Sequence, residues 1–249
     1  MERLKKFQLA WIPGVLFRPR STFAQITAQP VTTWLAPLLI LTVTGFLVIL
    51  VSGSLQGKSA GEITLPPDYQ YMTPEQQAQY NQANQLRQGP VFKFVFPAFS
   101  MLLKVWVGWL LVGGIIHLVL TFLGGRGSAA NALTLVAWAG LPFAIRDLVR
   151  LAYMLFTQKL IVSSGVSGLL DASQGGLVLF LANFLALIDI YLVWHVLILI
   201  AGIRSTSGLK TSKAVVSISF TILGVLVLQA LSSYALASLA NLSIVRMFF

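Results

Sequence analysis

Five stretches of the chain are long and apolar enough to cross a membrane as helices, and this feature restricts the fold more than any other. They cover residues 34–53, 97–123, 129–156, 175–203 and 214–242. A helix that crosses a hydrocarbon layer about 30 Å thick needs roughly 20 largely apolar residues. Only 10% of the 249 residues are charged, whereas soluble domains carry about 25%. The sequence therefore predicts an all-α, polytopic membrane protein, a bundle of five transmembrane helices.

The basic residues flank these stretches unequally. If the helices alternate in direction, one side takes Arg3, Lys5, Lys6, Arg18, Arg20, Arg126, Arg204, Lys210 and Lys213, and the other takes Lys58, Arg87, Lys93, Lys159 and Arg246. Cytoplasmic flanks carry the excess of Lys and Arg. We therefore predict a cytoplasmic N-terminus and a C-terminus outside. Because the basic residues lie beside apolar runs rather than on one aromatic-rich face, they indicate anionic lipid and not nucleic acid as their partner.

The predicted domain organisation has three parts: a cytoplasmic basic segment over 1–33, a membrane domain over 34–242 that includes an outer loop at 54–96, and a C-terminal tail over 243–249. In the basic segment, Phe23 and Ile26 share one face of a short predicted helix. One interpretation is an interfacial helix with this face in the headgroup layer and Arg18 and Arg20 near lipid phosphates. A basic anchor that only sets the topology is the other.

The outer loop contains a strong helix start. Thr73 is a capping residue, Pro74 suits the first helical position, and Gln76 follows three residues after the cap. These signals predict a helix over 74–88. Its Gln-rich composition has no strong apolar stripe, so it is either a docking element for a partner or a solvated spacer.

Motifs along the whole chain resemble bacterial membrane proteins of the Yip-one domain family. They are VLFRPR at 15–20 with Phe23 and Ile26, then Trp34 and Pro37, LGGRGS at 123–128, LVAWAGLP at 135–142, Trp194 with 197–202, and the pairs at 208–209 and 213–214. The resemblance implies a five-helix bundle with a cytoplasmic N-terminus, no catalytic activity and a bacterial inner-membrane location. The Gln-rich outer loop and the charges inside the middle helices depart from the family pattern.

The same resemblance bears on partners. Eukaryotic relatives bind small GTPases of the Rab type and form hetero-oligomers with related membrane proteins, and some bacterial relatives are associated with ABC-type export systems. The property that carries over is binding to other membrane proteins. The resemblance therefore implies a non-catalytic accessory or binding subunit of other membrane proteins, such as an export or transporter complex.

Charged residues fall inside the second, third and fourth stretches: Lys104, Arg146, Asp147, Arg150 and Asp189. Each costs roughly 2.5 to 3.5 kcal/mol on insertion, so it marks a functional site or an ion pair. At 1.5 Å per residue, Arg146 and Asp189 lie about 24 Å and 21 Å from the cytoplasmic surface, so Asp189 can pair with Arg146 or Arg150. Interhelical ion pairs are one interpretation. A polar pathway or anion site, as in a small transporter or channel, is the alternative, although no paired broken helices or repeat support it.

Two further sets of residues are candidates for helix contacts. His117 and His195 lie at similar depth, and with no third ligand they indicate an interhelical hydrogen bond rather than a metal site. Ala230, Ser233, Ala237 and Ala240 form a small-residue face on the fifth helix that allows close packing. The absence of cysteine excludes thiolate and disulfide chemistry, and no Gly-x-Ser-x-Gly motif is present. We therefore expect no catalytic residue, metal or cofactor.

The predicted orientation can be tested with single cysteines, because the chain has none of its own. With the N-terminus in the cytoplasm, Gln79 in the outer loop lies outside. We expect a Gln79→Cys protein to react with a membrane-impermeant thiol reagent in intact cells. A Lys210→Cys protein, the matched control, should react only after the cytoplasm is opened. The opposite pattern would reverse the orientation.

Overall fold

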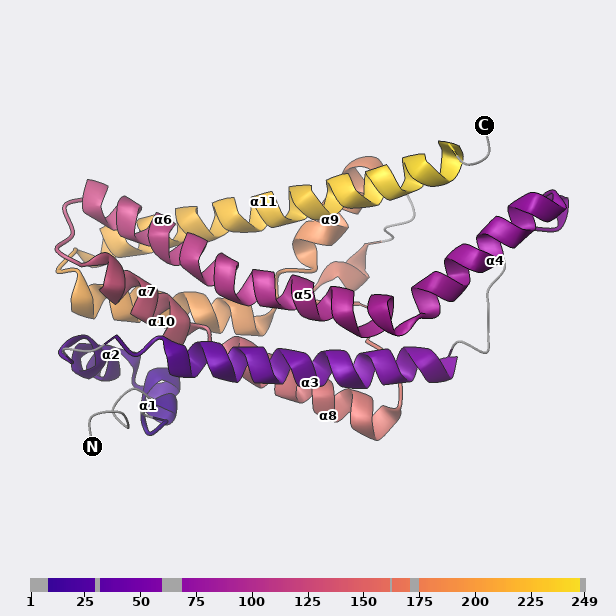
Figure 1. The fold of residues 1–249 in the computed structure, drawn as a ribbon. Helices are drawn as coiled ribbons and strands as arrows, with labels where there is room; N and C mark the ends of the chain where they lie inside the picture. Colours follow the sequence, from indigo (N-terminus) through magenta and orange to yellow (C-terminus); the bar gives the residue numbers. More distant parts are fainter. Residues whose placement is uncertain (1–8, 30–31, 60–68, 162, 171–174, 247–249) are drawn as a thin grey trace.

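The chain is described here by a computed structural model that covers residues 9–29, 32–59, 69–161, 163–170 and 175–246 (Figure 1). These residues form helices joined by turns and loops, with no strand in the part described. Four helical stretches are long and apolar enough to cross a membrane, or five if one bent pair counts as a span. The all-α membrane bundle is thus confirmed. Outside the described part lie Arg3, Lys5 and Lys6, and also the side chains of Lys58, Arg87, Ala240 and Arg246.

Three of the predicted spans are continuous helices. The first is α3 (Leu35–Ser59) and the fifth is α11 (Thr211–Arg246), which runs four residues into the predicted tail over 243–249. The second combines α5 (Phe96–Leu102) and α6 (Gly108–Phe122) with two π-helical turns, η3 (Val91–Val95) and η4 (Leu103–Val107). All three are longer than predicted: α3 at its C-terminal end, the second span at its N-terminal end and α11 at both ends.

The third span is interrupted at a single residue. It consists of α7 (Ala129–Ala139) and α8 (Leu141–Thr157), separated by Gly140. The hydroxyl of Ser128 accepts a hydrogen bond from the Asn131 N–H and starts α7. Pro142 stands in the first turn of α8, where its missing N–H leaves no helical hydrogen bond unmade.

The fourth span is not the single helix that the sequence analysis assumes. It is broken into α9 (Gly176–Leu185) and α10 (Ile190–Thr206), whose axes differ by 60°. The prediction of a continuous helix over 175–203 is therefore wrong. Long apolar runs stand on both sides of the interruption at 186–189, so hydropathy alone gives no sign of it.

The apolar face of the amino-terminal segment packs into the bundle instead of facing lipid. The segment forms α1 (Trp11–Phe17), which the sequence analysis does not predict, and α2 (Pro19–Thr27). Phe23 and Ile26 are 0% and 2% exposed, so the face assigned to lipid is buried in protein. The interfacial interpretation is wrong on this point, because α10 and α7 offer that face a protein surface. Arg18 and Arg20 stay exposed.

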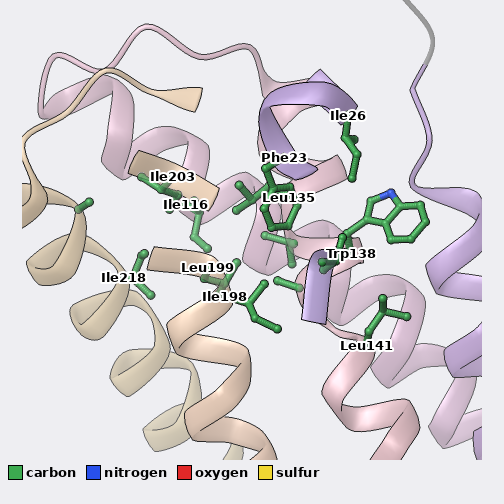
Figure 2. Close-up of a cluster of buried hydrophobic side chains, with 14 of the residues drawn as sticks. Phe23, Ile26, Ile116, Leu135, Trp138, Leu141, Ile198, Leu199, Ile203 and Ile218 are labelled. Atoms are coloured by element: carbon green, nitrogen blue, oxygen red, sulfur yellow. The ribbon is translucent and has the colours of Figure 1, made fainter. Parts of the chain in front are cut away.

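A single apolar core joins α1 and α2 to the spans. Val15 of α1 belongs to it. Its buried members also include Phe23 of α2 and, from α6, α7, α10 and α11, Ile116, Leu135, Trp138, Ile198, Leu199, Ile203 and Ile218 (Figure 2). The Trp138 indole N–H donates to the Thr33 hydroxyl at 3.2 Å, and its ring meets Trp11 edge-on with centroids 5.8 Å apart. The residues of α1 and α2 are therefore part of the same folded unit as the spans.

The bundle has two unlike ends (Figure 1). The end that we call the basic end holds α1, α2 and the turns after α6 and α10, and it carries Arg18, Arg20, Arg126, Arg204, Lys210 and Lys213. The two turns are tied together, since the Arg126 N–H donates to the Ser207 carbonyl at 3.1 Å. Gly124, with φ of 83°, makes the reversal after α6 in a conformation that favours glycine. The other end, from which α4 (Pro74–Gln88) projects, is called the α4 end.

A glycine allows the closest contact between α2 and α10. A Cβ atom on Gly202 would lie 2.5 Å from Leu135 Cδ1 and 2.8 Å from Phe23 Cδ2. We expect Gly202→Leu to lower the stability in detergent by about 1–3 kcal/mol, because it overpacks a full core. Thermal unfolding measures the effect. Gly224→Leu is the control, because Gly224 on α11 has open space around it. Equal melting temperatures for the two variants would contradict the expectation.

Candidate functional site

The charged residues of the spans converge on a cavity of about 620 Å³ between α3, the second span, α8 and α11. Lys104, Arg146, Asp147 and Arg150 all line it. The rest of the wall is mostly apolar. The cluster predicted from sequence therefore shares one location, with the cations of two spans facing the same space.

Arg146 is the centre of the cluster. One terminal nitrogen of its guanidinium lies 3.4 Å from Asp189 Oδ2, and Nε lies 3.5 Å from Asp147 Oδ1. Phe143, one turn earlier on α8, places its ring 4.9 Å from the guanidinium carbon. Neighbours on a helix point about 100° apart, so the Arg146 side chain must turn back to reach Asp147. One arginine therefore engages both carboxylates of the cluster.

Asp189 has two roles at the break in the fourth span. Its Oδ1 accepts the Leu192 N–H at 2.8 Å and so caps the start of α10, while Oδ2 faces Arg146. Asp189 is thus a capping residue at an interruption and not a charge within a continuous helix, as the sequence analysis assumes. Arg146, and not Arg150, is its ion-pair partner. The pair joins α8 to the first turn of α10.

The other side of the break is closed by a loop. The Val166 N–H donates to the carbonyls of Leu185 and Ile188, at 3.1 and 3.2 Å. Gly165 has φ of 57°, and a Cβ there would meet the same carbonyls. Non-helical backbone at membrane depth is tolerated where it is buried in protein or lines a cavity. The loop at 163–170 therefore satisfies the carbonyls that α9 leaves open.

Lys104 and Arg150 differ from Arg146. No carboxylate of the described residues lies within 4.0 Å of either cation. Lys104 belongs to η4, and π-helical turns inside α-helices are frequent at functional sites. Of the three cations that line the cavity, Arg146 alone is matched by carboxylates in the part of the chain that is described.

The two histidines do not form a pair. His195 is buried and its Nδ1 lies 2.7 Å from the Ala139 carbonyl, which joins α10 to α7. Its ring also packs on Phe143, with centroids 4.9 Å apart. His117 lines a separate small pocket near the basic end. His195 thus makes a hydrogen bond between helices, with a backbone carbonyl as its partner. The predicted pairing of the two histidines is not formed, because their rings line different spaces.

The remaining candidate residues are distributed over the surface and the core. Ala230 is fully buried, Ala237 is half-buried and Ser233 is exposed, so the small-residue face of α11 packs only in part. The described residues contain no group of three or more His, Asp or Glu placed to hold a metal.

Several residues of the site give only weak sequence signals. Asp189 stands directly before an apolar run, which is a capping signal, but a charge inside a hydrophobic stretch is more readily interpreted as part of the helix. Phe143 lies three residues before Arg146 and so shares its helix face. The positions of Gly165 and Val166 have no local signal, because their hydrogen-bond partners lie about 20 residues away.

Comparison with known families agrees with this architecture. The family model described as Yip1 domain matches residues 14–233, which is nearly the whole chain. The protein belongs to the Yip1 domain family. The matched part includes most of α1 and all of α2, in line with their place in the common core. Neither a curated protein nor a solved structure matches the chain.

Substitution of Asp189 separates its two roles in this Yip1 domain. Asn keeps a capping oxygen and removes the charge, whereas Ala removes both. We expect Asp189→Asn to lower stability by about 1.5–3 kcal/mol, the range for hydrogen bonds to charged groups. Asp189→Ala should cost roughly 1 kcal/mol more, from the lost cap. Thermal unfolding in detergent measures both losses.

The partner is identified by double variants. Adding Arg146→Gln to Asp189→Asn should recover part of the loss, because a buried charge without its partner costs more than a missing pair. Adding Arg150→Gln instead is the control, and it should recover none of the stability that Asp189→Asn loses. If the stability losses of Arg146→Gln and Asp189→Asn simply add in the double variant, the two side chains are not coupled.

Proposed function

We propose that this Yip1 domain protein is a non-catalytic accessory subunit that binds other membrane proteins, such as an export or transporter complex, in a bacterial inner membrane. The observation that carries the proposal is the position of α4. This helix projects from the bundle at the α4 end (Figure 1), and its main contact with the membrane helices is through η3. The resemblance to bacterial members of the family supports the type of partner and the location.

The helix α4 is stabilised by its own segment. The Thr73 hydroxyl accepts the Gln76 N–H, and the Gln76 side chain accepts the Thr73 N–H, which is a complete capping box. The short turn η2 (Tyr69–Tyr71) folds back on the helix, and the Tyr69 ring lies 5.5 Å from that of Tyr80. The Asn81 side chain donates to the Tyr69 hydroxyl at 2.9 Å. The helix is therefore formed before any partner arrives.

A preformed helix with a polar surface suits a docking role. Rigid binding elements lose less conformational entropy on association. The exposed side chains of α4 include Gln79, Asn81 and Gln82, whose amides both donate and accept hydrogen bonds. These groups favour a polar, folded surface of a partner over an apolar groove. The Yip1 family is not known for enzymatic activity, and this supports a binding role.

A small transporter or channel is the second candidate function. The cavity that holds Lys104, Arg146 and Arg150 favours it, together with the break between α9 and α10. Transporter sites are commonly formed by a pair of broken helices from two repeats. Among the described residues a single span is broken by more than 40°. The accessory role therefore has the stronger support.

Deletion of α4 distinguishes the two functions. We expect a protein in which 73–88 is replaced by a Gly-Ser bridge to keep its bundle, because no described side chain of α4 belongs to the core. Recovery of cross-linked membrane proteins from native membranes should fall about tenfold, as expected for the loss of a main contact. Thermal unfolding of the purified protein checks that the bundle is intact.

The control keeps the length and the helix. In it the exposed Gln and Asn residues of α4 are replaced by Glu, Lys and Ala in a pattern that preserves helicity. If α4 is the docking surface, recovery of the partner should also fall in this variant. Undiminished recovery in both variants would leave α4 as a spacer and remove the observation on which the accessory role rests.

A further inference from the structure

The cavity in the Yip1 domain is long and narrow. Its lining follows α3 from Leu38 to Ile49 and the second span from Pro97 to Val112. At 1.5 Å per residue these segments are about 16 Å and 22 Å long. A volume of about 620 Å³ is typical of a ligand pocket. Distributed over this length, it has the shape that one extended chain would fill.

The charge of the cavity is not balanced by the carboxylates of the described residues. Three cations, Lys104, Arg146 and Arg150, are accompanied by two carboxylates, Asp147 and Asp189, and both carboxylates contact Arg146. The five groups therefore carry a net charge of about +1 with two cations unmatched by ion pairs. Each such cation costs roughly 2.5 to 3.5 kcal/mol within the hydrocarbon layer. An anion between Lys104 and Arg150 would offset part of that cost.

The backbone of the second span supports a binding role for Lys104. The π-helical turn η4 contains this residue, and Met101, Lys104, Val105 and Gly108 all line the cavity. A helix without the wider turn would distribute successive side chains differently around its axis. Lys104 therefore reaches the cavity wall from a π-helical turn, the kind of irregularity that is frequent at functional sites.

The cavity has a polar part and an apolar part. Lys104 is 18 residues from the end of α6, and Arg150 is 21 residues from the start of α7, so both lie about 27–32 Å from the basic end. Towards the basic end the wall consists of apolar side chains, among them Leu38, Leu41 and Val112.

We propose that the cavity binds one phosphate-bearing membrane lipid, with its phosphate between Lys104 and Arg150 and an acyl chain along the apolar wall towards the basic end. Two basic side chains are suited to a phosphate, since charge-assisted hydrogen bonds are the strongest that side chains make. Arg146 does not take part in phosphate binding, because its guanidinium is engaged by Asp147 and Asp189. This site is independent of α4 and of the docking role.

The test uses the purified full-length protein and native mass spectrometry. The probe is lysophosphatidic acid, and a monoacylglycerol with the same chain is the uncharged control. Lys104→Gln and Arg150→Gln should each weaken lysophosphatidic acid binding by about tenfold or more, the equivalent of one charge-assisted hydrogen bond. Lys93→Gln is the matched control, since Lys93 lies on the same span and does not line the cavity.

Folding of the variants is checked on lipid-depleted protein. Lys104→Gln should melt at or above the temperature of the parent protein, because it removes a cation without an ion-pair partner. Equal affinity of the parent, Lys104→Gln and Lys93→Gln proteins for lysophosphatidic acid would overturn the site. Equal affinity for the monoacylglycerol and lysophosphatidic acid would also overturn it.

A second variant distinguishes a lipid from free phosphate. Val112→Trp fills the apolar part of the cavity and leaves both cations in place. It should weaken lysophosphatidic acid binding, and inorganic phosphate at millimolar concentration should not displace the lipid. If phosphate competes fully and Val112→Trp has no effect, the occupant is a free anion and the lipid proposal is overturned.

Discussion

The contact of Arg146 with two carboxylates is the interaction on which the middle of this structure depends. It holds the first turn of α10 against α8, and it does so at the point where the fourth span is interrupted. A broken helix within a membrane leaves N–H and carbonyl groups that no water satisfies. Asp189 satisfies one side of the break and Val166 the other. The interruption is thus stable because one ion pair and one loop close it.

The two ends of the bundle differ in how closely their helices pack. At the basic end, α2, α7 and α10 pack closely around Trp138, and glycine at 202 allows the near approach of Phe23. Indole hydrogen bonds connect the elements there and further along, from Trp194 to the Leu16 carbonyl and from Trp109 to the Leu133 carbonyl. Past this core the helices separate around the cavity. The bundle therefore has a closely packed half and a half with open internal space.

Much of the fold could be predicted from the sequence, because hydropathy and capping are local properties. The apolar stretches locate α3 and α11, and the Thr73 capping box locates the start of α4. The break before Asp189 could not be predicted in the same way, because apolar residues stand on both sides of it. The burial of Phe23 was missed for a related reason: an amphipathic helix has the same pattern whether its apolar face meets lipid or protein. The charge cluster could be located, but its division into matched and unmatched cations depends on side-chain distances.

The contacts of α1 imply an order of assembly. Leu16 and Trp194, which are joined by a hydrogen bond, are separated by 178 positions in the chain. During synthesis the amino-terminal helices are made first, yet the surface that covers them does not exist until α10 has entered the membrane. Because α10 supplies the largest part of the surface that α2 contacts, Phe23 cannot be fully covered before the fourth span has been made. The segment that is synthesised first therefore completes its packing only after a segment made much later is in place.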